Sequence, residues 1–210
     1  MPALVLPSLH NFSIDTIVQT PTTPTRTAFV FGWDNFVCPS TWLQQTMAIH
    51  PNQLQHPLLL QQLALLDHCI VNVLRQAHDI GPVFVMCESI STTLQMCQAF
   101  FPSCYHLFST SQVPLVASPS VSNTLDEICA NHLNIAMSLF APQSTLVILG
   151  LSSLRLSTTQ MQYHSWIVTK LVSSVRVQPS VLDVMNQLQT LSNGLLSVVV
   201  QHTSSLNMTL

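Results

Sequence analysis

The sequence predicts an α/β fold, a Rossmann-like three-layer sandwich with a mainly parallel central sheet. Two observations lead to this class. Short runs that are apolar along their whole length alternate with longer segments of helical periodicity. Strands without a polar face are typical of a parallel sheet that is covered on both sides. The length of 210 residues allows one well-buried core, so a single domain is expected over residues 28–210.

The first 27 residues are expected to form an arm that precedes this domain. Residues 20–25 read Thr-Pro-Thr-Thr-Pro-Thr, and this composition excludes a helix interior or a central strand. Residues 1–10 are apolar, but no basic residue precedes them and they contain Pro2 and Pro7. This pattern does not fit a signal peptide.

Strand and helix patterns then follow one another along the chain. The apolar run 28–31 predicts the first strand. Apolar residues at three- and four-residue spacing predict an amphipathic helix over 57–77, which ends near Gly81 and Pro82. A second strand at 83–86 and a helix at 91–101 come next.

The alternation continues to the C-terminus. Pro114 lies within the next strand, which predicts that this strand occupies an edge of the sheet. The remaining expected elements are a strand at 113–116, a helix at 124–139, a strand at 145–149, a helix at 154–164, a strand within 166–177, a helix from Pro179-Ser180 to about 191, and a last apolar run at 195–200.

The composition predicts that much of the surface is covered by other proteins. Only 6% of the residues are charged and 48% are hydrophobic, with a mean hydropathy of +0.42, whereas about 25% charged residues are usual. The polar residues are mostly Ser, Thr, Gln, Asn and His, which lose their hydration at a lower cost than Lys or Glu. A subunit of a large protein assembly is therefore expected, and a compositional drift of the source genome is the alternative.

Charge and cysteine usage exclude several classes of protein. The formal net charge is −3, and Lys170 and four arginines are spread along the chain, so no basic patch for nucleic acid is present. No run of roughly 20 apolar residues predicts a membrane span. The six cysteines form no C-x-x-C pair, which favours free thiols in a reducing compartment and a cytoplasmic or cytoskeletal location.

The segment after the first strand resembles a known family motif. Residues 32–37 read Gly-Trp-Asp-Asn-Phe-Val, and Trp42-Leu43 follow shortly after. This resembles the first motif of the haloacid dehalogenase (HAD) superfamily, especially a eukaryotic branch with Asp-Trp-Asp-Asp-Thr-Leu. The resemblance covers about residues 28–210, through the following ordered segments: 65–81, 83–89, 113–119, 146–151 and 175–191.

The resemblance implies a phosphatase fold whose catalytic groups are replaced. In the superfamily, a first aspartate attacks phosphorus and a second, two residues later, acts as acid and base. Those positions are Gly32 and Asp34 here, and Gly32 has no side chain to attack with. The motif that normally holds the phosphoryl group through a hydroxyl matches Cys87-Glu88-Ser89, where Glu88 would repel a phosphate.

Two further functional positions are also altered. The stretch 122–132, where the family carries a charge-neutralising lysine, contains Asp126 and Glu127 but no Lys or Arg. Leu151 stands where the family has an acid that binds Mg²⁺, and a leucine cannot be a ligand. No metal and no cofactor are therefore expected. About twenty residues separate the first strand from the first long helix, which leaves no room for a large cap domain.

The leading hypothesis is thus a non-catalytic HAD-like pseudoenzyme that acts as a structural or interaction subunit. One alternative is a residual hydrolase that uses Asp34, Glu88 or Cys87 in a remodelled cleft, and another is a small-molecule sensor. We expect Asp34 to cap a turn or a helix start, and Trp33 and Trp42 to pack in the core rather than form a binding platform. A zinc site is not expected, because the spacing of the nearest candidate ligands fits no closed site: His50, His56, His68 and Cys69.

Overall fold

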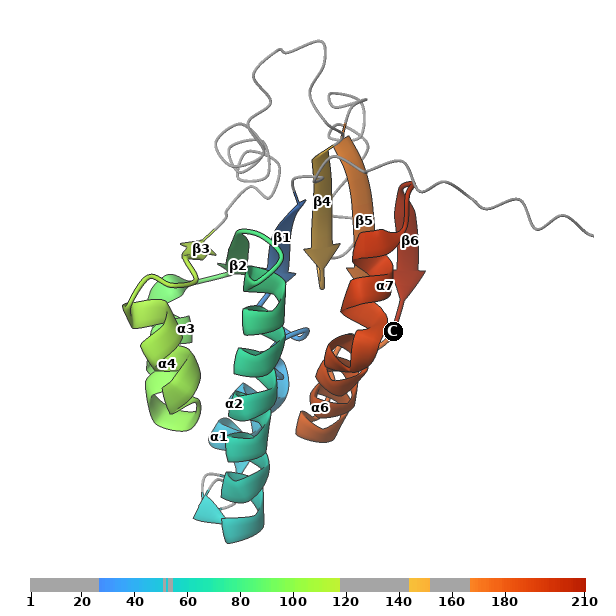
Figure 1. The fold of residues 1–210 in the computed structure, drawn as a ribbon. Coiled ribbons are helices and arrows are strands. Elements are labelled where there is room, and N and C mark those ends of the chain that lie inside the picture. Colours follow the sequence, from blue (N-terminus) through green and yellow to red (C-terminus); the bar gives the residue numbers. More distant parts are fainter. Residues whose placement is uncertain (1–26, 51, 53–54, 118–143, 152–166) are drawn as a thin grey trace, which may run out of the picture.

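The computed structural model describes residues 27–50, 52, 55–117, 144–151 and 167–210. These residues form a six-stranded sheet in which every described pair of neighbouring strands is parallel (Figure 1). The α/β class with a parallel sheet is therefore confirmed. The strand order is β3-β2-β1-β4-β5-β6, with these bounds: β1 Thr27–Gly32, β2 Val83–Cys87, β3 Leu115–Ala117, β4 Ser144–Leu149, β5 Ile167–Ser173 and β6 Leu206–Thr209.

The central strands carry apolar side chains on both faces. All residues of β1, β2 and β4 are buried, as expected for strands without a solvent-facing side. Because successive side chains point to opposite faces, Phe29 and Phe31 join one apolar cluster and Ala28 and Val30 join a second one. The two clusters lie on the two faces of the sheet.

The described helices pack on the first of these faces, the one that carries Phe29 and Phe31 (Figure 1). Their buried residues belong to the same cluster as those two rings. The bounds are α1 Ser40–Ile49, α2 Pro57–His78, α3 Ile90–Phe100, α4 Pro102–Ser109, α6 Val181–Thr190 and α7 Leu196–Gln201, with a break, η2 Leu191–Leu195, between the last two.

The connections before β2 and before β6 have opposite hands. Helices α2 and α6 contact each other on one face. The chain moves from β1 to β2 in one direction across the sheet, and from β5 to β6 in the other. Crossovers between parallel strands are right-handed in nearly all proteins. One of these two connections, β1 to β2 or β5 to β6, must therefore be left-handed.

Several sequence predictions are confirmed at the level of single elements. Helix α2 begins at Pro57, and β3 is an edge strand of the described sheet that follows Pro114. Ser180 caps α6 through a capping box with Asp183. The helices predicted at 124–139 and 154–164, and residues 1–26 of the predicted arm, lie outside the described ranges.

Other elements differ from the sequence prediction. A ten-residue helix, α1, occupies part of the segment between β1 and α2, where no helix was predicted. The helix predicted at 91–101 ends at Phe100, and a separate helix, α4, begins at Pro102. Asp67 explains this second start, because its carboxylate accepts hydrogen bonds from the amides of Ser103 (2.9 Å) and Cys104 (3.0 Å). A residue of α2 thus caps α4 across the core.

One buried cation joins β5 to the end of α7. The Lys170 side chain is 1% exposed, and its Nζ donates a hydrogen bond to the Val200 carbonyl at 2.6 Å. Burial lowers the pKa of Lys170, because the charged form loses hydration. Its charge still lies at the C-terminal end of a helix, where a cation is favoured.

Helix α2 is long and apolar enough to cross a membrane by length and composition alone, and is the one described helix that is. In this structure it packs against the sheet through an apolar stripe that includes Leu63, Leu66, Ile70 and Leu74. The same properties are typical of the core helix of an α/β domain.

Candidate functional site

The positions singled out in the sequence come together at the carboxyl edge of the sheet. Gly32 ends β1, Cys87 ends β2, and Leu151 follows β4 by two residues. Because β1 lies between β2 and β4, these positions are neighbours. The chain leaves β1 in one direction and β4 in the other, so a ligand crevice is expected between these two strand ends. The stretch with Asp126 and Glu127 lies outside the described residues.

The crevice between β1 and β4 is closed at Gly32. A Cβ atom added to Gly32 would lie 2.9 Å from the Gly150 carbonyl oxygen and 3.1 Å from Cδ2 of Leu151. The turn after β4 therefore occupies the space in which a side chain at position 32 would begin. Any larger side chain there requires that this turn moves.

Phe36 completes the closure from the other side. Its ring is 1% exposed and lies so close to Gly150 that a Cβ added to Gly150 would overlap it. Gly150 has a φ of +81°, a conformation that favours glycine. The Phe36 carbonyl accepts a hydrogen bond from Gln187 of α6 at 3.1 Å. A phenyl ring and a leucine thus fill the place where ligands bind in related sheets.

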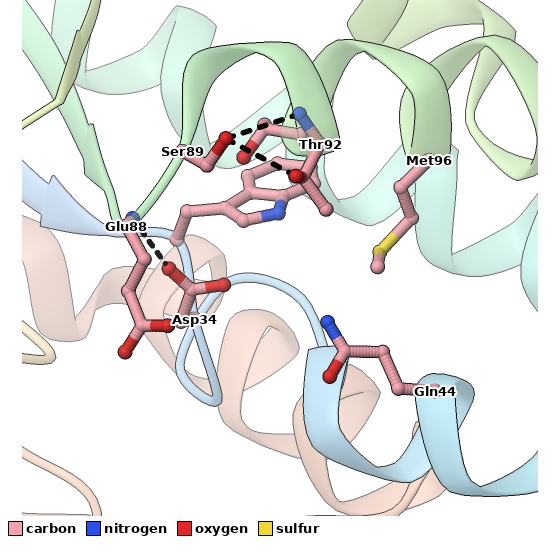
Figure 2. A pocket seen from close by; sticks show the side chains of 8 residues that line it. Asp34, Gln44, Glu88, Ser89, Thr92 and Met96 are labelled. Carbon is pink, nitrogen blue, oxygen red and sulfur yellow. Dashed lines mark hydrogen bonds between the residues drawn. The ribbon is translucent and has the colours of Figure 1, made fainter.

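The Asp34 carboxylate accepts a main-chain hydrogen bond. Its Oδ2 accepts a hydrogen bond from the Glu88 amide at 2.9 Å (Figure 2), which ties the loop after β1 to the loop after β2. Asp34 does not cap a helix start as predicted, and Asn35 caps the start of α1 in its place. Asn35 Oδ1 accepts from the Thr41 amide at 3.1 Å, and Asn35 Nδ2 donates to the Thr41 hydroxyl at 2.8 Å.

Trp33 packs in the core, as predicted. Its side chain is fully buried and meets the rings of Phe101 and Phe108 edge-on, at centroid distances of 6.3 Å and 5.5 Å. Such edge-to-face pairs are favourable. The indole Nε1 finds no hydrogen-bond acceptor within the described part of the chain. Trp42 is half-buried and packs against the same apolar cluster.

A small polar pocket remains beside the closed crevice. Its volume is about 180 Å³, and it lies at the ends of β1 and β2 and the start of α3. Figure 2 shows Asp34 and Glu88 on one side of it and Gln44 and Met96 on the other. The lining residues are Trp33, Asp34, Gln44, Glu88, Ser89, Thr92, Thr93 and Met96.

The chemistry of this pocket does not favour a phosphate. The lining contains two carboxylates, and no Lys, Arg or His is among its lining residues within the described ranges. Ser89, which the sequence resemblance matched to a phosphate-binding position, caps α3. Its Oγ accepts from the Thr92 amide at 3.4 Å and from the Thr92 hydroxyl at 3.1 Å. Among the described lining residues, a phosphate would meet two carboxylates and no Lys or Arg.

The thiols near the pocket have raised pKa values. Burial raises the pKa of Cys87, and the negative charge of Asp34 raises it further. Burial also raises the pKa of Cys38, Cys97 and Cys104. Since the thiolate is the nucleophile, the structure does not support a catalytic cysteine at position 87.

The parts of the chain that the structure describes contain no candidate metal site. There, no group of three or more His, Cys, Asp or Glu residues is arranged to hold an ion. The five cysteines of those ranges are free.

The sequence did not predict the role of two residues that close the site, Phe36 and Gly150. Phe36 was expected only as part of the family motif, and the positive φ of Gly150 has no signal beyond the presence of a glycine.

A comparison with protein-family models, with curated proteins and with solved structures finds no match to this chain.

Proposed function

We propose that this chain is a degenerate HAD-like protein without catalytic activity, which serves as an interaction subunit of a larger protein assembly. The closed crevice at Gly32 carries the proposal. The position of the family's nucleophile is a glycine, and the Gly150 carbonyl and the Leu151 side chain fill the adjoining space. A side chain restored at position 32 would therefore meet the turn after β4, so a single substitution would not be enough to rebuild the site.

The other groups that a hydrolase would need are engaged elsewhere. Asp34 accepts the Glu88 amide, Ser89 caps α3, and Cys87 is a neutral thiol because burial raises its pKa. Each of these roles is structural. They argue against the residual-hydrolase alternative, and the acidic lining of the pocket argues against a sensor of phosphorylated metabolites.

The interaction half of the proposal rests on the surface of α2 and its neighbours. Between residues 57 and 74 the single charged residue is Asp67, and it is buried. The exposed side of this segment therefore carries no Asp, Glu, Lys or Arg, and Leu58 is 64% exposed. A half-open groove of about 440 Å³ adjoins Leu58 and reaches Leu182 of α6, which is 59% exposed. An uncharged apolar surface of this kind is typical of protein interfaces, and it fits a partner that presents uncharged side chains.

A phosphatase assay tests the catalytic half. Purified wild-type protein and Asp34→Asn are incubated with a generic phosphomonoester and Mg²⁺, and released phosphate is measured. We expect both proteins to equal the protein-free blank. Turnover by the wild type that disappears in Asp34→Asn would establish a working hydrolase and overturn the proposal. Asparagine can still accept the Glu88 amide, so a folding defect is not expected to confuse the result.

The size of the native assembly tests the interaction half. Extracts of the source cells are separated by size, and the chain is expected in a species larger than a dimer of the 23.2 kDa polypeptide. Leu58→Lys and Leu182→Lys are expected to shift the chain to smaller species, because a partner would have to desolvate the new charge. Gln98→Lys, on the exposed side of α3, is the matched control and should leave the size unchanged. A wild-type chain that is never larger than a dimer would contradict this half.

A further inference from the structure

Strand β6 presents an open edge whose outward groups can be identified. Leu210 donates its amide to the Ser173 carbonyl and accepts from the Val175 amide, both at 2.8 Å. Its hydrogen-bonding groups therefore point toward β5. Because these groups alternate along a strand, those of Met208 also point toward β5. The amides and carbonyls of Asn207 and Thr209 then point away from the sheet.

This edge lacks the features that usually prevent strand pairing. The described strand order ends at β6, and both Asn207 and Thr209 are exposed. Residues 195–210 contain no Asp, Glu, Lys, Arg or Pro, and His202 is their single ionisable side chain. Natural edge strands are normally protected by charges, prolines or bulges. Within the described residues, the edge is neutral and its outward main-chain groups have no partner.

We propose that two copies of this chain associate through their β6 edges, in antiparallel pairing about a twofold axis at Met208. This axis places Asn207 of one copy opposite Thr209 of the other. Residues opposite each other in such a pair exchange both of their main-chain hydrogen bonds, so all outward groups of these two residues are satisfied in both copies. The identical neutral strands bring no like charges together, and an isologous interface of this kind closes at two subunits.

The side chains support the same register. Met208 is half-buried against the apolar cluster under the helices. At the twofold axis it forms the non-hydrogen-bonded pair with its own copy, in which side chains lie closest. The two Met208 side chains would therefore extend the apolar layer of one copy into that of the other. This inference is independent of the proposed lack of catalysis.

The mass of the purified full-length chain in solution tests the inference. The wild type is expected at twice 23.2 kDa. Asn207→Pro removes one outward amide without touching the bonds between β5 and β6, and is expected to raise the dimer dissociation constant at least tenfold. Asn207→Lys is a second variant that keeps the amide and adds charge to both edges. Asn186→Lys, on the exposed side of α6, is the matched control and should remain dimeric.

Circular dichroism of each variant shows whether the fold is intact. If Asn207→Pro is unfolded, the mass of Asn207→Lys shows whether the dimer depends on this edge. A wild type that is monomeric at every concentration overturns the proposal. So does an oligomer whose mass is unchanged by the Asn207 substitutions. Neither result bears on the phosphatase assay or on assemblies larger than a dimer, so the two proposals fail separately.

Discussion

Placing an alanine at Gly32 measures how tightly the turn after β4 packs against the end of β1. The added Cβ would lie 2.9 Å from the Gly150 oxygen and 3.1 Å from Leu151 Cδ2, both closer than ordinary van der Waals contact. Overpacking of a rigid core costs about 1–3 kcal/mol. Gly32 has no positive φ, so alanine fits its backbone and recovers about 0.4–1 kcal/mol from the unfolded chain. A net loss of about 1–2 kcal/mol is expected for Gly32→Ala.

Gly32→Asp is expected to destabilise the protein more than Gly32→Ala. Gly32→Asp adds the same crowding and a carboxylate at a buried site, where an unpaired charge costs several kcal/mol. Urea unfolding followed by tryptophan fluorescence gives both values. Gly32→Ala should also lower the melting temperature by about 2–8 °C, at the 2–4 °C per kcal/mol usual for this size. If Gly32→Ala is as stable as the wild type, the crevice is not closed, and the structural argument for lost catalysis fails.

Two further changes test interactions that hold the scaffold. Asp67→Asn keeps one acceptor oxygen for the amides of Ser103 and Cys104, so the loss of a charge-assisted bond should destabilise the protein by about 1.5–3 kcal/mol in urea unfolding. Asp183 of the α6 capping box is only partly buried, and Asp183→Asn should destabilise the protein less, by about 0.5–1 kcal/mol. Burial lowers the pKa of Lys170 below 10.5, so the unfolded chain binds more protons between the two values and stability should increase with pH across that window. Lys170→Met should abolish this increase in stability, which is measured by urea unfolding from neutral pH to about 10.5. An unchanged pH dependence of stability would show that Lys170 is not its source.

The elements that the sequence predicted are those whose signal is local. The helix over 57–77 follows from its own apolar periodicity, and the uniformly apolar runs at 28–31 and 145–149 identify buried parallel strands. Pro179-Ser180 marks the start of α6 because a serine can cap a helix within its own first turn. Nothing outside these segments was needed.

The elements that were missed depend on residues far apart in the chain. Helix α4 starts where it does because Asp67 accepts its first amides from 36 and 37 positions earlier in the chain. The periodicity of 91–101 alone cannot show that a helix ends there and another begins. At the site, the sequence shows directly that Gly32 has no side chain. The closing role of Phe36 depends on its contact with Gly150, and this contact cannot be predicted from the spacing of residues in the sequence.

A double-mutant cycle can separate two ways in which the crevice is closed. Cδ2 of Leu151 and the Gly150 carbonyl both limit position 32, but one belongs to a side chain and the other to the backbone. If the side chain dominates, Leu151→Ala should make room, and Gly32→Ala should then cost at least 0.5 kcal/mol less than in the wild type, as contacting residues show. The nearer atom is the backbone oxygen, so we expect a residual cost of about 1 kcal/mol to persist in the double variant. Complete relief would mean that the Leu151 side chain, and not the Gly150 carbonyl, limits the space at position 32.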